Sequence, residues 1–431
     1  MALGQVERIV CPRCSLLCDD VFCVINDGKI VSTYNACMRG DAFLKLVNSP
    51  NRLTNPLILE EGRLKPAHLS EALDVACNLL SRAKKPLLYG WGSVSYEAQE
   101  VGIQLAEKLE GVIDSTSSIC HGISLRLIEE ISREEFKCPT LEEVGDMADL
   151  VVYWGSNPAD SHSRHLSRYT VFPRGKVRIT GRLEREVVVV DVIKTRSAKG
   201  INLFLQIEPE KDLNLIKALI EYLSGKELPE NVGGIMKKDI IDFGKMMKKA
   251  QFGTIFFGLG ILQQENFKEN IEGLIKLVKH PNLKGQFSLM PMIGHSNMLG
   301  FNLAAKKMAG VPYGYGIDFS KNPPEKTTVT EALINGDCDA ALIIGANPFA
   351  SFPQKLVEKL QNIPLIVIDT QMNLTVKKAS VAIPATITGV ETEGTMIRMD
   401  MQTKKLRKFL DSPSENCLPD KEILQNLLQK I

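Results

Sequence analysis

The chain has 431 residues, and its 52 Lys and Arg residues nearly balance its 51 Asp and Glu residues. This length, with 44% hydrophobic residues, predicts two or three globular domains with sizeable cores. The net charge of +1 argues against nucleic acid or an anionic lipid surface as a partner. The sequence has no uninterrupted run of about 18 apolar residues that could cross a membrane. The first ten residues show neither a basic stretch before an apolar core nor twin arginines, so we expect a cytoplasmic protein.

Four cysteines near the N-terminus form the first functional pattern. Cys11, Cys14 and Cys18 make a C-x2-C-x3-C motif, and Cys37 follows in the sequence Cys-Met-Arg-Gly. Thiolates this close in sequence converge only if the backbone wraps around a shared group, and an iron–sulfur cluster takes four of them. The pattern favours a 4Fe-4S cluster. Structural zinc is the main alternative, although zinc sites more often use two C-x2-C pairs, and unliganded thiols are the third. Cys23 could replace Cys37 as the fourth ligand, in a poorer context.

The segment after the first three cysteines predicts a β-hairpin. The apolar run 21–25 and the segment Lys29-Ile-Val31 flank the turn sequence Asn-Asp-Gly. A small antiparallel sheet of this kind is a reasonable platform for a cluster. We therefore expect residues 1–55 to form a separate cysteine-containing domain.

From about residue 66 the sequence alternates between helical and strand patterns. A helix, a buried strand and a second helix are predicted over residues 70–83, 86–90 and 96–109. A strand, a glycine turn and a helix make up the βα unit of an open parallel sheet. Gly92 and Ser93, in the turn after the strand, are candidate cofactor contacts.

Cys120 and His121 follow the small polar residues 114–118. We expect a loop here, at the carboxyl edge of the sheet, where α/β proteins keep their chemistry. The cysteine could be a nucleophile with the histidine as its base, a thiolate ligand of a metal beside a proton-carrying histidine, or a buried thiol. The cysteine cluster and the nucleotide-type motifs described next favour the metal ligand.

Two segments form a weak internal repeat. Residues 149–158 and 339–348 each contain a buried strand followed by Gly-x-Asn-Pro. Such a turn at the carboxyl end of a parallel strand places backbone N–H groups where a phosphate binds. A second apolar strand follows each copy and ends in aspartate, which can bind ribose hydroxyls or a guanine edge. The residues predicted to bind a nucleotide are Gly155, Asn157, Pro158, Asp191 and Thr195 in the first copy, and Gly345, Asn347, Pro348 and Asp369 in the second.

Neither copy contains Gly-x-Gly-x-x-Gly, so a nicotinamide cofactor is disfavoured. Other candidates are less specific. His162 and His165 could contact phosphate or lie on a solvated helix face, and His295 lies in a polar, glycine-rich loop. The segment 389–395 is too polar for a core and too rich in glycine for a helix, so we expect a binding loop.

These motifs occur together, in this order, in the molybdopterin oxidoreductases, which the chain resembles. Within that superfamily it is most similar to the family of formylmethanofuran dehydrogenase B subunits. The matching stretches span nearly the whole chain and are Cys11–Asp20, Gly90–Gly122, Tyr153–Lys199, Pro291–Asn302 and Gly389–Asp400.

The resemblance implies a tungsten or molybdenum ion held by two molybdopterin guanine dinucleotides. It assigns Cys120 as a ligand of that metal, His121 as a proton-transfer residue and Arg39 as the basic residue between cluster and pterin. His295 is a further candidate for a catalytic residue, beside Cys120 and His121. Further cofactor contacts are expected at Glu393, Gly394 and Thr395. The family reduces CO2 to formate or runs the reverse reaction.

The sequence departs from the family at one position and is shorter than its larger relatives. Ile293 stands where an arginine is expected, and that arginine would be the natural cation for a carboxylate product. About 35 residues follow Thr395, where larger relatives carry a β-barrel domain that closes over the pterins. The resemblance therefore implies partner subunits: a zinc amidohydrolase that condenses formate with methanofuran, a β-barrel molybdopterin-binding subunit and ferredoxin-like subunits.

The predicted fold is α/β, with the small cluster domain and two Rossmann-like domains related by a pseudo-twofold. Residues 141–325 are expected to be inserted between 56–140 and 326–431, which form the other domain. Two other functions stay open. One is a formate dehydrogenase-like enzyme without a methanofuran step, and the other is a non-catalytic scaffold subunit of a formyltransferase/hydrolase complex.

Overall fold

The computed structural model describes residues 5–133 and 138–431. The described chain divides into two compact units of mixed α/β structure. Unit 1 contains Met1–Gly122, Gly294–Arg398 and Thr403–Ile431, and unit 2 contains Ile123–Ile293 and Met399–Gln402. The chain thus leaves unit 1 after the helix that carries Cys120 and returns to it just before His295.

These bounds differ from the predicted insert of residues 141–325. Unit 2 ends at Ile293 because β15 (Gly316–Asp318) pairs with β7 (Val112–Ser115) in the sheet of unit 1. It begins at Ile123 because α5 (Gly122–Arg133) buries Leu127 in the core of unit 2. The cysteine segment 1–55 is also part of unit 1.

Unit 1 is built on a nine-stranded sheet. The strands in spatial order are β16 (Glu325–Thr327), β15, β7, β6 (Pro86–Gly90), β17 (Ala340–Ile344), β18 (Leu365–Asp369), β19 (Val381–Pro384), β4 (Leu57–Glu60) and β5 (Arg63–Pro66). The five strands from β7 to β19 are parallel and the edge strands are antiparallel. The central strands read as continuous runs of Leu, Ile, Val and Ala because both faces of a parallel sheet are buried.

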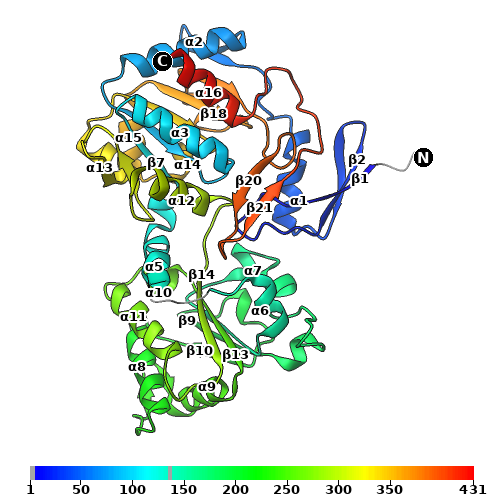
Figure 1. The fold of residues 1–431 in the computed structure, drawn as a ribbon, viewed down its shortest axis with the longest axis vertical. Helices are drawn as coiled ribbons and strands as arrows, with labels where there is room; N and C mark the ends of the chain where they lie inside the picture. Colours follow the sequence, from blue (N-terminus) through cyan, green and yellow to red (C-terminus); the bar gives the residue numbers. More distant parts are fainter. Residues whose placement is uncertain (1–4, 134–137) are drawn as a thin grey trace. The chain divides into compact units, whose positions relative to one another are not determined.

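Helices cover both faces of this sheet (Figure 1). One face packs against α2 (Leu69–Arg82), α3 (Tyr96–Lys108), α12 (Met298–Ala309) and α16 (Asp420–Lys430). The other packs against α13 (Val329–Asn335) and α15 (Gln354–Gln361). The short helices α4 (Ser117–Cys120) and α14 (Pro348–Ser351) follow β7 and β17, and the hairpin of β20 (Gly394–Ile397) and β21 (Thr403–Leu406) completes the unit. The predicted helices and strands of residues 70–109 are confirmed within about two residues.

The cysteine segment forms a three-stranded antiparallel sheet and one helix. Its elements are β1 (Gln5–Ile9), β2 (Val21–Asn26), β3 (Lys29–Tyr34) and α1 (Met38–Leu44). Strands β2 and β3 are joined at Asp27 and Gly28, both with positive φ, so the predicted hairpin is confirmed.

Unit 2 contains a five-stranded parallel sheet. Its strands in spatial order are β10 (Leu203–Gln206), β9 (Glu186–Asp191), β8 (Leu150–Trp154), β13 (Phe252–Phe257) and β14 (Gln286–Pro291). One face packs against α8 (Asp212–Leu223), α9 (Lys237–Lys249), α10 (Leu259–Leu262) and α11 (Phe267–Val278). Helix α6 (Leu141–Met147) begins with a capping box between Thr140 and Glu143, and α7 (Pro158–Ser161) follows β8. A two-stranded ribbon of β11 (Asn231–Val232) and β12 (Ile235–Met236) lies beside α9.

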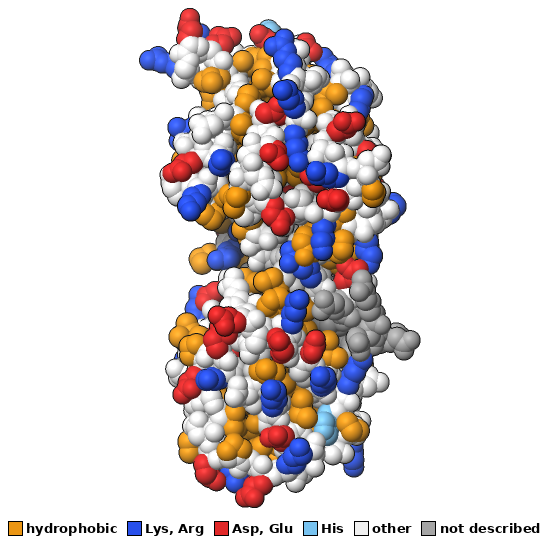
Figure 2. Space-filling view, turned by 90° about the vertical axis from the view of Figure 1, so that its left-hand side faces the viewer, with side chains coloured by type: hydrophobic (Ala, Val, Ile, Leu, Met, Phe, Trp, Pro, Cys, Tyr) orange, Lys and Arg blue, Asp and Glu red, His pale blue; other side chains and the backbone are white. Residues whose placement is uncertain are grey.

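The surface carries mixed charges. Figure 2 shows Lys and Arg interspersed with Asp and Glu over one face of the molecule, with scattered hydrophobic side chains. Among the residues that the structure describes, no helix has the length and apolar character needed to cross a bilayer.

Candidate functional site

The four predicted cluster cysteines converge. The N–H of Cys11 donates to the carbonyl of Cys18 at 2.9 Å, which closes the first turn. Cys37 caps α1, and its sulfur accepts the N–H of Gly40 at 3.3 Å. A Cβ on Gly40 would lie 3.3 Å from the Cys11 sulfur and 3.6 Å from the Cys37 sulfur, so the missing side chain leaves room for both thiols. Burial raises the pKa of Cys11, and the thiols of Cys14, Cys18 and Cys37 raise it further, as expected for sulfurs that face one another.

Two arginines accompany this group of thiols. Burial raises the pKa of Cys14, and the positive charges of Arg13 and Arg39 oppose that rise. Arg39, predicted to lie beside the cluster, is therefore close enough to the Cys14 thiol for its charge to lower the pKa of that thiol. Cys23 lies apart: burial in β2, then Asp41 and Glu7, raise its pKa to about 12, and it contributes nothing to the pKa of Cys11.

Among the described residues, no three Cys, His, Asp or Glu side chains are close enough together to hold one metal ion. A tetrahedral zinc needs its ligands around one centre. A polynuclear cluster takes one thiolate at each iron, so its ligands need not meet at one centre.

Cys120 lies at the end of α4, a short helix where the sequence predicted a loop. The helix is anchored by the buried carboxylate of Asp114, at the end of β7. That carboxylate accepts the N–H of Ser115 at 2.8 Å, the hydroxyl of Ser118 at 2.5 Å and the N–H of Val329 at 2.6 Å. Burial raises the pKa of Asp114 to about 7. The Cys120 thiol is exposed, and desolvation raises its pKa as well.

A second anchor, Asn302 of α12, was missed in the sequence analysis. Its amide donates to the Ser117 hydroxyl at 3.3 Å, and its carbonyl oxygen accepts the N–H of Gly314 at 2.6 Å. Asn302 lies 185 residues from Ser117 in sequence, so no local pattern marks the contact. Both anchors fix the helix that presents Cys120.

Contacts around two glycines bring His121 and His295 to neighbouring positions of unit 1. A Cβ on Gly294 would lie 2.8 Å from Nε2 of His121, and a Cβ on Gly92 would lie 3.4 Å from Cγ of His295. His295 has a φ of +55°, a strained conformation for a residue with a side chain. Burial and the charge of Arg13 lower the pKa of His295, so its imidazole is neutral at physiological pH.

Two buried amides, also missed in the sequence analysis, hold these loops together. Gln99 donates to the carbonyls of Trp91 at 2.7 Å and Asn297 at 2.9 Å. Asn297 donates to the carbonyl of Val94 at 2.8 Å and accepts the N–H of Ile397 at 2.8 Å. The turn after β6, the loop of His295 and strand β20 are thereby tied into one arrangement.

The two Gly-x-Asn-Pro turns have the same hydrogen bonds. In unit 1, the side-chain oxygen of Asn347 accepts the N–H of Thr375 at 3.3 Å and its hydroxyl at 2.8 Å, and that hydroxyl accepts the N–H of Phe349 at 3.3 Å. In unit 2, Asn157 accepts the N–H and hydroxyl of Ser197 at 3.3 and 2.7 Å, and that hydroxyl accepts the N–H of Ala159 at 3.0 Å.

Each turn lies at a point where the strand order reverses. In unit 1 the reversal is between β6 and β17, and in unit 2 between β8 and β13. Ligands of open parallel sheets bind in the crevice at this point, outside the carboxyl ends of the strands. A cavity of about 220 Å³ occupies the position in unit 1, and its lining includes Ser93, Gly345, Asn347 and Asp369.

The aspartates that end the next strands differ. Asp369 is buried and accepts the N–H groups of Thr370 at 2.6 Å and Gln371 at 3.0 Å and the amide of Asn373 at 2.8 Å. Burial raises its pKa to about 6. Asp191 is half-buried, and burial also raises its pKa.

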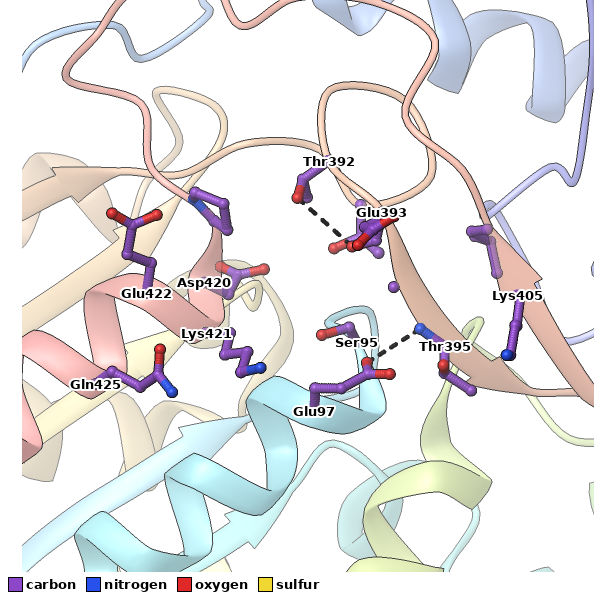
Figure 3. A pocket seen from close by; sticks show the side chains of 14 residues that line it. Ser95, Glu97, Thr392, Glu393, Thr395, Lys405, Asp420, Lys421, Glu422 and Gln425 are labelled. Atoms are coloured by element: carbon purple, nitrogen blue, oxygen red, sulfur yellow. Dashed lines mark hydrogen bonds between the residues drawn. The ribbon is translucent and has the colours of Figure 1, made fainter.

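Residues 392–395 of the segment 389–395 line a larger cavity of unit 1, of about 560 Å³. Figure 3 shows Glu393 and Thr395 around it, together with Glu97, whose carboxylate accepts the N–H of Thr395 at 3.0 Å. Glu391 is turned away and forms a buried ion pair with Arg52 at 2.6 Å.

Known proteins match this chain over almost its whole length. A profile of the molybdopterin oxidoreductase family matches residues 52–430. The chain is 40% identical to the B subunit of the tungsten-containing formylmethanofuran dehydrogenase 2 of Methanocaldococcus jannaschii, over 99% of this chain and 98% of the relative. It is 37% identical to the protein of the same description in Methanococcus maripaludis, with the same coverage. The chain belongs to the formylmethanofuran dehydrogenase B-subunit family of molybdopterin oxidoreductases.

Other relatives of this oxidoreductase are more distant. The alpha subunit of the F420-dependent formate dehydrogenase of M. jannaschii is 23% identical, over 99% of this chain and 70% of the relative. A chain of the formyltransferase/hydrolase complex from Methylorubrum extorquens, solved with methylofuran, superposes with a TM-score of 0.67 at 17% identity. The match covers 87% of this chain and 98% of that one, and it shows a common fold.

Three residues of unit 2 differ from what the sequence suggested for this molybdopterin oxidoreductase. His162 and His165 are buried, and not on a solvated helix face: His165 bonds the Tyr153 hydroxyl at 3.1 Å, and His162 bonds the carbonyl of Ile293 at 2.8 Å. Ile293, where an arginine was expected, is itself buried. This position thus contributes a backbone acceptor and no charge.

Proposed function

We propose that the chain is the redox subunit of a formylmethanofuran dehydrogenase. It reduces CO2 reversibly to formate, which a partner subunit condenses with methanofuran. The observation that carries the proposal is the likeness to B subunits along nearly the whole chain, together with the convergence of the cluster cysteines and the anchored position of Cys120.

Cys11, Cys14, Cys18 and Cys37 would hold a 4Fe-4S cluster. The facing thiols, the room left by Gly40 and the nearby arginine charges support this assignment. Bound thiolates carry negative charge that burial opposes, and the irons and these arginines would offset that cost. The cluster would supply single electrons to the second centre.

Each Gly-x-Asn-Pro turn would bind one molybdopterin guanine dinucleotide. In unit 1 the residues that fit are Gly92, Ser93, Gly345, Asn347, Pro348 and Asp369. In unit 2 they are Gly155, Asn157, Pro158, Asp191 and Thr195. The buried hydroxyls without a hydrogen-bond partner in the described chain include Thr195 Oγ1 in unit 2 and Thr386 Oγ1 in the lining of the 220 Å³ cavity. Buried polar atoms of this kind are expected where a polar ligand binds.

Cys120 would bind the tungsten or molybdenum ion. When bound, the pterin–metal centre supplies the two-electron chemistry that interconverts CO2 and formate. His121 would hold or release the proton of that reaction at its imidazole, since it directly follows the ligand and lies against Gly294. His295, neutral and buried, would orient the substrate by hydrogen bonding. Arg13, whose charge acts on His295, brings a cation to this region in the absence of an arginine at 293.

The partners would be an amidohydrolase, a β-barrel molybdopterin-binding subunit and ferredoxin-like subunits. Glu393, Gly394 and Thr395 line the 560 Å³ cavity, and we assign them to the cofactor side of such a complex. The whole assembly would work in the cytoplasm.

The test is elemental analysis of the native protein, purified without oxygen, for iron, tungsten, molybdenum and zinc. We expect about four irons and about one tungsten or molybdenum per chain. Cys37→Ser should lower the iron content, whereas the matched control Cys23→Ser should leave it unchanged. Cys120→Ser should keep the iron and abolish formate oxidation with an artificial electron acceptor. Zinc without iron in the wild-type protein would refute the cluster assignment.

The same preparation separates the two other functions. A formate dehydrogenase-like enzyme would show formate oxidation but purify without an amidohydrolase. A scaffold subunit would purify with its complex yet contain neither tungsten nor molybdenum.

A further inference from the structure

One segment of unit 2 exposes large hydrophobic side chains for which the function proposed above has no role. Residues 171–185 precede β9 and lie beside α6 (Figure 1). Four side chains of this segment are each more than half exposed: Phe172, Val177, Ile179 and Leu183. Single exposed hydrophobic residues are normal on a protein surface, but four on one short segment indicate an interaction surface.

A buried arginine fixes the backbone of this segment. Arg185 is 2% exposed, and its guanidinium donates to the carbonyls of Ala148 at 3.0 Å and Val171 at 3.1 Å. It also donates to the carbonyl of Pro173 at 2.6 Å and to that of Gly145. Burying a guanidinium is costly unless its N–H groups are satisfied, and here they tie both ends of the segment to the end of α6.

Hydrogen bonds also hold the middle of the segment. The N–H of Gly175 donates to the carbonyl of Arg178 at 3.0 Å, and the N–H of Arg178 donates to the carbonyl of Asp146 at 3.2 Å. The Arg178 guanidinium pairs with Asp149 at 3.1 Å. The exposed hydrophobic side chains are thus presented by a fixed backbone, and a pre-organised surface loses less conformational entropy when it binds.

Leu183 lines a cavity of about 390 Å³ together with Met246 of α9. The wall of this cavity also includes Asp149, Glu186 and Gln251, which lie at the amino ends of β8, β9 and β13. The Gly-x-Asn-Pro turn of unit 2 lies at the carboxyl end of β8, on the opposite edge of the sheet. The cavity is therefore separate from the proposed cofactor site, and its place beside an exposed leucine suits a side chain of another protein.

The charges of the segment have one sign. Residues 172–183 contain no acid and four cations: Arg174, Lys176, Arg178 and Arg182. Arg178 is paired with Asp149, whereas Arg174 and Lys176 are exposed and form no ion pair with the described residues. A surface that presents two unpaired cations among hydrophobic side chains complements a partner surface with carboxylates among hydrophobic side chains.

The acids in the cavity wall do not offset these two cations. Asp149 pairs with Arg178 and accepts the N–H groups of Gln251 and Phe252, each at 2.9 Å. Glu184 accepts a backbone N–H of its own loop at 2.7 Å. Glu186 remains, and the cavity lining supplies a cation of its own in Lys249.

We propose that the segment 172–183 and the adjoining cavity are the surface of unit 2 on which a partner subunit docks. The partner presents carboxylates to Arg174 and Lys176 and places a hydrophobic side chain in the cavity beside Leu183. A second copy of this chain is a poor occupant, because a twofold contact through this surface would bring the cations of both copies together. The inference rests on the proposed function for the existence of the complex, and it specifies the surface and the chemistry of one partner.

The experiment is zero-length carbodiimide cross-linking of the native complex, purified through a tag on this chain. The reagent joins a lysine amine to a carboxylate that it contacts, and mass spectrometry locates the link. We expect Lys176 to be linked to an Asp or Glu of another subunit. Lys176→Arg keeps the charge but lacks the amine, so it should abolish that link and leave the complex intact. An intact complex in which Lys176 is unlinked, or linked only to a second copy of this chain, would overturn the inference.

Variants of the same surface should release the partner. Leu183→Asp should weaken its binding at least about tenfold, measured as the ratio of partner to this chain by native mass spectrometry. A chain carrying both Arg174→Glu and Lys176→Glu should lose the partner at a lower salt concentration than the wild type. The matched control is Met236→Asp, at an exposed hydrophobic residue of unit 2 outside this surface, which should keep the wild-type ratio. A wild-type ratio in Leu183→Asp would contradict the proposed docking.

Measurements on the full chain without partners separate docking from other roles. Leu183 is 88% exposed, so Leu183→Asp should melt within about 2 °C of the wild type. A melting temperature several degrees lower would make Leu183 a structural residue and overturn the inference. So would binding of the wild-type chain to vesicles of anionic lipid that the variant has lost. Failure of the proposed function is distinguishable: a complex with neither tungsten nor molybdenum that still gives the Lys176 link would refute that function and keep this surface.

Discussion

The two Gly-x-Asn-Pro turns are alike within themselves and differ in what surrounds them. Gly155 and Gly345 both have a φ of +54°, and the backbone angles of Asn157 and Asn347 agree within a few degrees. Both asparagines bind a hydroxyl residue from the segment after the next strand. The residues packed around each turn are different in the two units.

In unit 2 the turn is packed against backbone. A Cβ on Gly155 would lie 2.6 Å from the backbone nitrogen of Ile261, whereas a Cβ on Gly345 would only touch the Val94 side chain at 3.5 Å. In unit 1 the crevice is open, and its lining includes Asp369 and Asp420, whose pKa values are raised by burial. A repeated motif thus specifies the turn, while the segments packed against it decide how much room a ligand has.

The largest expected difference between the copies is their response to alanine. Gly155→Ala should lower the free energy of unfolding by about 3 kcal/mol or more, because the new Cβ meets backbone that cannot move aside, in addition to the cost of positive φ. Gly345→Ala should cost about 1 kcal/mol, from φ alone. Urea unfolding measures both effects, and hydrogen–deuterium exchange locates each in its unit. Equal losses would mean that the turn alone, without its neighbours, sets the stability.

The parts of this molecule that the sequence predicted are local ones. Runs of Val, Ile and Leu predict the buried strands, Asp27 and Gly28 predict the hairpin, and Gly-x-Asn-Pro predicts the two turns. Each of these structures depends on residues only a few positions apart. The convergence of Cys11, Cys14 and Cys18 follows from the same logic.

What the sequence did not predict depends on contacts between distant segments. The segments that carry Thr386 and Asp420 are joined by a bridge between Ala385 and Leu418, and Asn302 hydrogen-bonds Ser117 across the unit. Ser197 and Thr375 were hidden for another reason: they follow their asparagines by 40 and 28 residues, so no fixed spacing reveals the common role. The place of β15 and β16 in the sheet of unit 1 was not predicted either, because these short edge strands carry no clear period.

The carboxylates of unit 1 should make its stability depend on pH. Burial raises the pKa of Asp369 to about 6 and that of Asp420 to about 7, above the usual value near 4 in the unfolded chain, while Arg52 acts in the opposite direction on both. The folded state therefore binds protons more tightly than the unfolded state, and the free energy of unfolding should fall as the pH rises from about 5 to about 8.

Urea unfolding across this range tests the dependence. In the Asp420→Asn variant, the free energy of unfolding should fall less over this pH range. One of the two titrating carboxyl groups is gone, and the other, Asp369, no longer faces a like charge. A wild-type stability that rises between pH 5 and pH 8 would contradict the assignment.

The smallest expected effect tests the likeness itself. Ser197→Ala and Thr375→Val each remove a hydroxyl that donates to the asparagine oxygen and accepts a backbone N–H. Each should cost about 1–2 kcal/mol in the free energy of unfolding, because one buried N–H loses its acceptor. Since the hydrogen bonds of the two turns match, the two losses should agree within about 0.5 kcal/mol. A clearly larger loss of unfolding free energy in one unit would show that the residues packed around that turn also change the strength of its hydrogen bonds. The two copies would then share their geometry but not their contribution to stability.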